Sequence, residues 1–236
     1  MALILGIETA TTICSVALVK DGKLIAHRES EGLKEHSAEL TGYISDVFLD
    51  TGFIYQQLDA IAVSIGPGSY TGLRIGLSSA KGLCYALDKP LIAVDTLKSL
   101  AWQALRKCNL QARNTGNALF VPMLDARRME VYTAVYDNTL NLVESVNALV
   151  VSENVFDKYP GKEIIYFGEG AEKCRQTFGS KNNFTLLDAV TLSAEAICML
   201  ALNDYENGTF ADVAYSEPFY LKEFVAGKPR VKGLYE

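Results

Sequence analysis

Residues 2–29 read ALILGIETATTICSVALVKDGKLIAHRE, and this stretch predicts three consecutive β-strands joined by short turns. The continuous apolar run over 2–7 is typical of a buried strand. A second strand is expected over 13–19, after the small polar cluster at 9–12. A third is expected over 23–29, because Asp21-Gly22 makes a hairpin turn in which glycine tolerates positive φ. The chain therefore opens with a three-stranded meander.

The same order of elements returns in the second half of the chain. Strands are expected over 118–124, 130–136 and 140–146, with turns at 125–128 and 137–138. Each meander leads into alternating helices and strands. In the first half, helices are expected over 37–51, 70–87 and 96–107, and strands over 58–65 and 91–94. In the second half, an α/β-like segment is expected over 152–158, strands over 163–167 and 184–187, and helices from 171 on and over 193–205.

This repetition predicts a duplicated α/β unit. Residues 1–108 form the first expected domain and residues 109–236 the second, with the polar stretch 109–117 as the linker. The last segment of the chain is expected to pack back on the first domain. A single larger α/β domain is the alternative.

A three-stranded meander with a turn between its first two strands resembles the phosphate loops of the actin-like superfamily, which includes sugar kinases and Hsp70 proteins. An acidic residue commonly ends the first strand there, and Glu8 occupies that place. The resemblance implies an α/β, actin-like (ASKHA, ribonuclease H-like) fold of duplicated domains with mixed sheets. It also implies that any remnant of a nucleotide site lies at Glu8, Thr9, Thr11 and Asp125. Acidic residues end many strands, so a structural role for Glu8 is the alternative.

Composition and charge narrow the class of protein. The 236 residues are 49% hydrophobic and 21% charged, which suits a folded core and excludes collagen-like and low-complexity chains. The formal net charge is −6. An acidic surface does not attract nucleic acid in general, so any RNA role is local or depends on a partner.

The cysteines, the histidines and the N-terminus indicate an intracellular protein. Five cysteines form no CxxC pair and two histidines show no zinc-finger spacing, so buried, reduced thiols and no metal site are expected. The N-terminal apolar run lacks the basic region of a signal peptide and is too short to span a membrane. We therefore expect a cytoplasmic location without a membrane association.

The most specific local feature is the glycine-rich segment 65–76, IGPGSYTGLRIG. Gly66, Pro67 and Gly68 predict a tight turn, and Ser69 or Thr71 is placed to cap the next helix. The segment lacks the Gly-Lys-Ser/Thr of a P-loop and the spacing of a dinucleotide-binding fingerprint. Phosphate binding is therefore not indicated.

The helix that follows carries two stripes of interest. Gly72, Gly76 and Ala80 recur every four residues, and such a stripe lets a second helix approach closely. An apolar stripe with alternating spacings of four and three residues runs beside it. Contact with a partner and complete burial within the chain's own domain both remain open. The apolar stripe consists of Leu73, Leu77, Ala80, Cys84 and Leu87.

At this segment the sequence resembles a known family. Residues 66–76 are similar to the signature of the TsaB (YeaZ) family, which is needed for the threonylcarbamoyladenosine (t6A) modification of tRNA. Four further stretches occur in the family's order, so that the resemblance covers nearly the whole chain. In the first of these stretches the family more often has Asp at the position of Glu8. The four are residues 5–18 (LGIETATTICSVAL), 35–40 (EHSAEL), 125–132 (DARRMEVY) and 217–221 (EPFYL).

The catalytic paralogue TsaD differs at one decisive place. In that family the strand after the glycine-rich helix leads into Asn-His-x-x-Gly-His, whose histidines bind a metal. The matching segment here is residues 91–100, LIAVDTLKSL, in which Thr96 and Leu100 stand where the histidines would be. Leucine cannot ligate a metal, and threonine is a poor ligand for iron or zinc.

The resemblance thus implies a non-catalytic subunit with no cofactor of its own. Such a subunit supports TsaD in forming t6A at adenosine 37 of tRNA, within the bacterial threonylcarbamoyl-transferase complex. ATP and metal are expected on the partners, TsaD and the ATPase TsaE. Contact of this chain with tRNA is expected to be indirect or weak.

The resemblance also implies a helical bundle built from the first two helices of each partner. The helices over 37–51 and 70–87 would then meet TsaD, or a second copy of the chain in a homodimer. His36 as a helix-start residue and Arg74 in an intramolecular or solvated pair are the alternatives. The expected interface residues are His36, Leu40, Tyr43, Leu73, Arg74, Leu77, Ala80, Lys81 and Cys84.

Two basic stretches have both a structural and an RNA-binding interpretation. Arg127 and Arg128 either shape the turn after the strand over 118–124 or contact RNA. The C-terminal tail either is a solvated end or contacts tRNA. Its basic residues are Lys222, Lys228, Arg230 and Lys232.

Two rival functions use other residues. A nucleotide-dependent kinase or ATPase needs carboxylates for Mg²⁺, for which Glu8 and Asp125 are candidates, and an adenosine loop, for which Gly168-Glu169-Gly170 is the one candidate. A peptidase needs a histidine base, and His36 is the candidate. Neither has a motif as specific as the glycine-rich segment.

Overall fold

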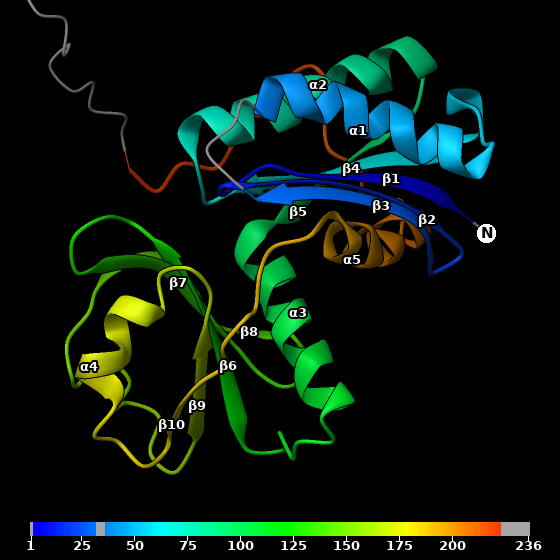
Figure 1. Ribbon diagram of the computed structural model, residues 1–236. Helices are drawn as coiled ribbons and strands as arrows, with labels where there is room; N and C mark the ends of the chain where they lie inside the picture. Colours follow the sequence, from blue (N-terminus) through cyan, green and yellow to red (C-terminus); the bar gives the residue numbers. More distant parts are fainter. Residues whose placement is uncertain (1, 32–35, 223–236) are drawn as a thin grey trace, which may run out of the picture.

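The computed structural model describes residues 2–31 and 36–222, with Glu31, His36 and Ser37 described through their backbone alone. It contains two five-stranded mixed sheets, drawn at the top and at the lower left of Figure 1. The fold is α/β, and the two sheets are built on one plan.

The first sheet has the strand order β3-β2-β1-β4-β5. Its three-stranded meander is antiparallel, and β4 and β5 extend it as parallel strands on the other side of β1. β1 is buried along its whole length because both faces of the sheet are covered. The strands are β1 (Leu3–Glu8), β2 (Ile13–Lys20), β3 (Lys23–Glu31), β4 (Ala60–Gly66) and β5 (Leu91–Asp95).

The second sheet repeats this topology. Its order is β10-β9-β6-β7-β8, so that β6 takes the place of β1, the antiparallel meander continues through β7 and β8, and β9 and β10 add in parallel. The predicted duplication of the meander is therefore confirmed. The strands are β6 (Ala118–Asp125), β7 (Glu130–Tyr136), β8 (Leu142–Val150), β9 (Glu163–Phe167) and β10 (Phe184–Leu186).

Two helices cover the upper face of the first sheet in Figure 1. They are α1 (His36–Thr51) and α2 (Tyr70–Leu87), and the short 3₁₀ helix η1 (Tyr55–Gln57) follows α1. Each places one apolar face on the sheet, as the amphipathic patterns predict. The other face of both helices points away from the molecule.

The two halves exchange one helix each. α3 (Thr96–Leu110) follows β5 of the first sheet but packs on the second, where it contributes Leu97 and Leu100 to the core around Phe120. α5 (Ala194–Glu206) belongs to the second half but covers the lower face of the first sheet, with Ile197 against the β1 and β2 side chains. A division at residue 108 therefore separates α3 from the core that it completes, and the structural units differ from the predicted domains in this respect.

The last described segment ties the two halves together. We call residues 211–222 the C-terminal strap. Ala211 pairs with Leu91 at the edge of the first sheet, and the Phe219 amide donates to the Ile65 carbonyl over 2.7 Å. Lys222 then forms an ion pair with Glu130 of the second half.

Some predicted elements differ from the observed ones. Residues 152–158 form turns without a regular helix or strand, and the helix expected from Ala171 consists of a 3₁₀ turn η2 (Glu172–Cys174) and the single turn α4 (Arg175–Phe178). β8 begins two residues later than predicted and ends four residues later. All five cysteines are free and buried, as expected for reduced core thiols. Among the described residues there is no helix that could cross a membrane.

Candidate functional site

The glycine-rich turn holds the turn between β1 and β2, which is the place of a phosphate loop in an actin-like protein. The Ser69 amide donates to the Ala10 carbonyl over 2.6 Å, and the Thr9 hydroxyl donates to the Gly72 carbonyl over 2.8 Å. Ser69 also caps α2, because its Oγ accepts from the Gly72 amide, while Thr71 is exposed. These hydrogen bonds hold the glycine-rich turn directly against the β1–β2 turn.

The two glycines of the α2 stripe, Gly72 and Gly76, face this turn. A Cβ atom at Gly72 would lie 2.1 Å from the Thr9 carbonyl oxygen, and one at Gly76 would lie 2.3 Å from the Thr9 hydroxyl. A Cβ at Gly68 would lie 2.5 Å from the Ala10 carbonyl oxygen. The stripe therefore permits close packing within the chain, which corrects its interpretation as a surface for a partner helix.

Glu8 is completely buried at the end of β1. Its Oε1 accepts hydrogen bonds of 2.7 Å from the Ala10 amide and from the Ser64 hydroxyl, while its Oε2 has no partner. Desolvation raises the pKa of this carboxyl to about 7, although the hydrogen bonds oppose the shift. A carboxyl enclosed in this way braces the turn and does not reach a ligand in the interdomain space.

Asp125 lies at the end of β6, the position that corresponds to Glu8 in the second half. It is exposed, accepts from the Arg127 amide over 2.9 Å and pairs with Lys173. Partial burial would raise its pKa, but the hydrogen bonds from Lys173 and the Arg127 amide hold the pKa below its usual range. Of the predicted nucleotide remnant, Glu8 and Thr9 are thus enclosed in the first half, and Asp125 is engaged by a lysine in the second.

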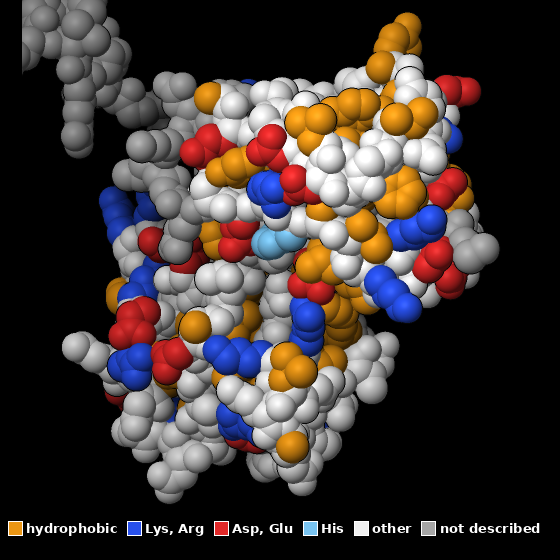
Figure 2. Space-filling view, turned by 45° about the vertical axis from the view of Figure 1, so that its right-hand side comes forward, with side chains coloured by type: hydrophobic (Ala, Val, Ile, Leu, Met, Phe, Trp, Pro, Cys, Tyr) orange, Lys and Arg blue, Asp and Glu red, His pale blue; other side chains and the backbone are white. Residues whose placement is uncertain are grey.

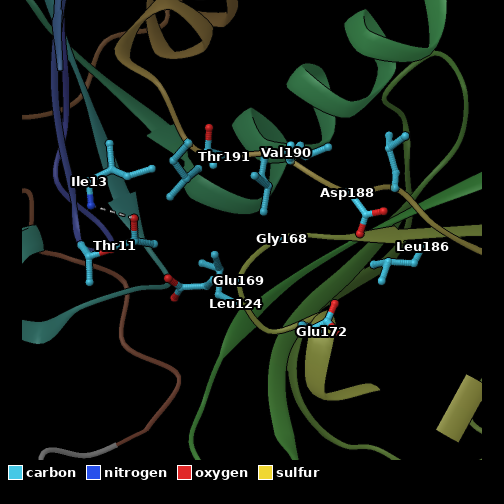
Figure 3. Close-up of a pocket in the computed structure, with 15 residues that line it drawn as sticks. Thr11, Ile13, Leu124, Gly168, Glu169, Glu172, Leu186, Asp188, Val190 and Thr191 are labelled. Carbon is cyan, nitrogen blue, oxygen red and sulfur yellow. Dashed lines mark hydrogen bonds between the residues drawn. The ribbon is translucent and has the colours of Figure 1, made fainter. Parts of the chain in front are cut away.

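A cavity of about 280 Å³ lies between the β1–β2 turn and the second half, with Thr11 on its wall (Figure 3). Its apolar lining includes Ile13 and Leu124, and its polar lining includes acidic side chains but no lysine or arginine. This lining offers no basic side chain that would pair directly with a phosphate group. The acidic side chains are Glu169, Glu172 and Asp188.

Ser15, His27 and Glu29 form the one Ser–His–carboxylate group of the described residues, and it lacks the geometry of a catalytic triad. The Ser15 Oγ and Glu29 Oε2 atoms lie 2.9 and 3.4 Å from the same nitrogen of His27, Nε2, whereas a triad uses both ring nitrogens. Ser15 is buried and accepts from the Ala194 amide at the start of α5. This group joins α5 to the first sheet. The side chain of His36, the residue named for a peptidase, lies outside the described residues.

The apolar stripe predicted as the partner interface belongs to the chain's own core. Leu40, Leu77, Ala80 and Cys84 are at most 4% exposed and pack together on the first sheet. Leu73 is buried as well, in the core shared with α3. These five side chains therefore offer little or no surface to a partner, and they pack within the chain's own core.

The other predicted interface residues are engaged within the chain or only partly exposed. Arg74 is exposed, stacks on Tyr70 at 3.9 Å and donates to the Tyr220 hydroxyl over 3.0 Å, which is the intramolecular alternative. Lys81 donates to two carbonyls of the C-terminal strap over 2.9 and 3.1 Å. Tyr43 is partly buried against the core, and the His36 side chain lies outside the described residues.

The face of α1 and α2 that does point outward was missed by sequence reasoning. A Cβ atom at Gly42 or Gly82 would meet nothing within 4 Å, while Leu49 is 78% and Tyr85 88% exposed. In Figure 2, orange side chains lie among small white ones at the top of the molecule. In the sequence, this face could have been found from the positions of each helix that lie half a turn away from its apolar stripe. We call these residues the outer helix face: Ala38, Gly42, Ser45 and Leu49 of α1, and Ser78, Gly82 and Tyr85 of α2.

Comparison with known proteins agrees with this architecture. Residues 25–225 match the family model described as "TsaD: tRNA N6-adenosine threonylcarbamoyltransferase". The "tRNA threonylcarbamoyladenosine biosynthesis protein TsaB" of Escherichia coli is 33% identical over 95% of this chain and 96% of its own length. The protein of that name from Bacillus subtilis is 36% identical over 61% of this chain and 58% of its own.

Solved structures show the same fold. The structure titled "YeaZ from Pseudomonas aeruginosa" aligns with a TM-score of 0.77 at 27% identity, covering 94% of this chain and all of that one. A second Pseudomonas aeruginosa structure, of a protein "with similarity to peptidase YEAZ", gives 0.79 at 26% identity, again over 94% of this chain and all of the other. The chain therefore belongs to the TsaD-type domain family and, within it, to the TsaB (YeaZ) group of tRNA threonylcarbamoyladenosine biosynthesis proteins.

Proposed function

We propose that this chain is a non-catalytic subunit that binds a TsaD-type catalytic subunit through its outer helix face. In this role it supports the formation of t6A at adenosine 37 of tRNA in the cytoplasm. ATP and metal act on the partners, TsaD and TsaE. Contact with tRNA is restricted to a local part of this acidic chain.

The observation that carries the proposal is the packing of Thr96 and Leu100, the two residues that the resemblance to TsaD matches with its metal-binding histidines. Thr96 is buried and its Oγ1 accepts from the Gly66 amide over 3.0 Å, so it fastens α3 to the glycine-rich turn. Leu100 packs in the core of the second sheet and closes one wall of the cavity. Both positions serve packing, which supports a role other than catalysis.

The outer helix face suits a helical partner. Small side chains at Gly42, Ser45, Ser78 and Gly82 let another helix approach closely, since nothing projects between the two backbones. Leu49 and Tyr85 add large exposed apolar side chains at its edge, and tyrosine is among the residues enriched at the energetic centres of interfaces. A second copy of the chain would use the same face in a homodimer.

The test is co-elution with TsaD in size-exclusion chromatography. Gly82→Gln places a side chain in open space, so the chain itself is not strained, and loss of a helical glycine stabilises the helix by about 0.5–1 kcal/mol. We expect this variant to melt at a higher temperature and to lose most of its affinity for TsaD. Gly82→Ala is the matched control, with the same gain in the helix and a smaller protrusion.

The outcomes separate the parts of the proposal. Absence of any complex between the unchanged chain and TsaD, together with normal t6A in cells lacking the chain, would refute the subunit role. A complex that tolerates Gly82→Gln would place the interface elsewhere. Light scattering on the isolated chain tests the homodimer, and addition of TsaE to the complex tests the third partner.

A nucleotide-dependent kinase or ATPase is not favoured by the geometry. Its phosphate loop would be the β1–β2 turn, which is occupied by the glycine-rich segment, and its carboxylate Glu8 is enclosed. Turnover of ATP by the purified chain would revive this alternative.

A further inference from the structure

The turn between β6 and β7 has an unusual backbone for its residues. Arg127 and Arg128 have φ angles of 70° and 50°, so two consecutive arginines lie in the left-handed region. Glycine, asparagine and aspartate adopt this region most readily, because a Cβ atom is strained at positive φ. Hydrogen bonds of 3.1 and 3.2 Å between residues 126, 127 and 130 hold the turn in place. We call residues 126–129 the arginine turn.

Both arginine side chains are exposed, and no ion pair of the described residues includes either of them. The carboxylates beside the turn are instead taken by lysines. Lys173 pairs with Asp125 and donates to the Glu130 carbonyl over 2.7 Å, and Lys222 of the C-terminal strap pairs with Glu130. Arg127 interacts with Asp125 only at longer range, and both guanidinium groups are accessible to solvent.

The local charge differs from that of the whole chain. Arg127, Arg128, Lys173 and Lys222 stand against the carboxylates of Asp125, Glu130 and Glu169, the last of which lines the neighbouring cavity. The turn itself, residues 126–129, carries two positive charges and no negative one in a chain whose formal charge is −6. On an acidic protein, a polyanion is attracted at an isolated basic site and repelled elsewhere. Such a site therefore directs the contact to one place.

We propose that the arginine turn is a contact site for the phosphate backbone of RNA, and that it holds the substrate tRNA while the partner subunit carries out the reaction. This inference rests on the proposed function, which supplies tRNA as the polyanion. Guanidinium groups pair with phosphate oxygens through two parallel hydrogen bonds, which a lysine cannot do. Exposed Met129, 44% accessible beside the arginines, offers an apolar surface to a sugar or base.

The strained backbone strengthens the argument. Residues that keep an unfavourable φ without a packing reason are more frequent at functional sites, where the surroundings maintain the strain. Neither arginine packs into the core here, so nothing in the fold requires an arginine at these positions.

The test is the binding of an unmodified tRNA transcript to the complex of this chain with TsaD, followed by fluorescence anisotropy at several salt concentrations. Arg127→Asn with Arg128→Gly relaxes the turn and removes both charges. We expect a higher melting temperature, about tenfold weaker tRNA binding at 0.15 M salt, and a slope of log K against log salt that is smaller by about 1 to 2. Arg127→Lys with Arg128→Lys should keep most of the slope and lose part of the affinity.

The control removes the same charge elsewhere. Lys23→Gln with Lys162→Gln alters two exposed lysines, one on the first sheet and one at the start of β9, at the opposite end of the second sheet from the turn. We expect tRNA binding within twofold of the unchanged complex. If Arg127→Asn with Arg128→Gly melts at a lower temperature than the unchanged chain, Arg127→Gln with Arg128→Gln removes the two charges without that change of backbone preference.

Each result bears on the proposal. Unchanged affinity and slope in the charge-removing variants would overturn it. A charge-removing variant that binds TsaD much more weakly, but binds tRNA normally once the complex is formed at high concentration, would also overturn it. The arginines would then contact an acidic surface of TsaD. If the unchanged chain forms no complex with TsaD, the proposed function fails and the arginine turn is not the cause.

Discussion

Replacing either of two glycines on α2 by alanine should have opposite effects on stability. Gly72 faces the β1–β2 turn, where a Cβ atom would lie 2.1 Å from the Thr9 carbonyl oxygen, whereas Gly82 faces open space. Alanine is preferred to glycine in a helix by about 1 kcal/mol, and that gain applies in full at Gly82. At Gly72 it is outweighed by overpacking, which costs about 1–3 kcal/mol.

The helix gain is common to both variants, so they should differ by the overpacking cost, about 1–3 kcal/mol in the free energy of unfolding. In a chain of this size that corresponds to roughly 2–12 °C in Tm, with Gly82→Ala above the unchanged protein and Gly72→Ala at or below it. Scanning calorimetry and urea unfolding in one buffer measure both. Equal shifts for the two variants would refute the assignment of the stripe to the β1–β2 turn, and would return Gly72 to the surface for a partner.

Two further predictions concern buried polar groups. The pKa of the Glu8 carboxyl is about 7 in the folded state and ordinarily 4.5, so the folded state prefers the protonated carboxyl. This preference stabilises the folded state by about 3 kcal/mol below pH 4.5. The stabilisation is lost as the pH rises through 7. Glu8→Gln should flatten the dependence of unfolding free energy on pH between 5 and 8, and an unchanged slope in urea titrations would contradict the assignment. Ser15→Ala removes the acceptor of the buried Ala194 amide and should cost about 1–3 kcal/mol, whereas full stability by the same titrations would show that α5 is held without this bond.

The sequence predicts the strands well because their patterns are local. The apolar run before Glu8, the Asp21-Gly22 turn and the glycine-rich segment each determine structure within a few residues. The repetition of the meander then led to two sheets with one topology, which the structure confirms. The predicted capping role of Ser69 is confirmed for the same reason.

What the sequence does not determine is which apolar face meets which sheet. α3 and α5 both carry an apolar face, and nothing in their patterns shows that each packs on the sheet of the other half. The same ambiguity misassigned the apolar stripe of α2, since Leu77 and Cys84 suit a core as well as an interface. The outer helix face is composed of small residues, which carry little hydrophobic signal. The strain in the arginine turn depends on φ angles and is likewise absent from composition.

The helix exchange has a consequence for synthesis on the ribosome. All five strands of the first sheet have been translated once Asp95 is added, but α5, which covers one apolar face of that sheet, is complete only at Glu206. At ordinary rates of translation that face, which includes Ile4 and Val19, stays uncovered in the nascent chain for on the order of ten seconds. A nascent chain stalled before α5 should accordingly bind a holdase chaperone more strongly than one stalled after it, and truncated products should aggregate and not accumulate as a half-sized domain.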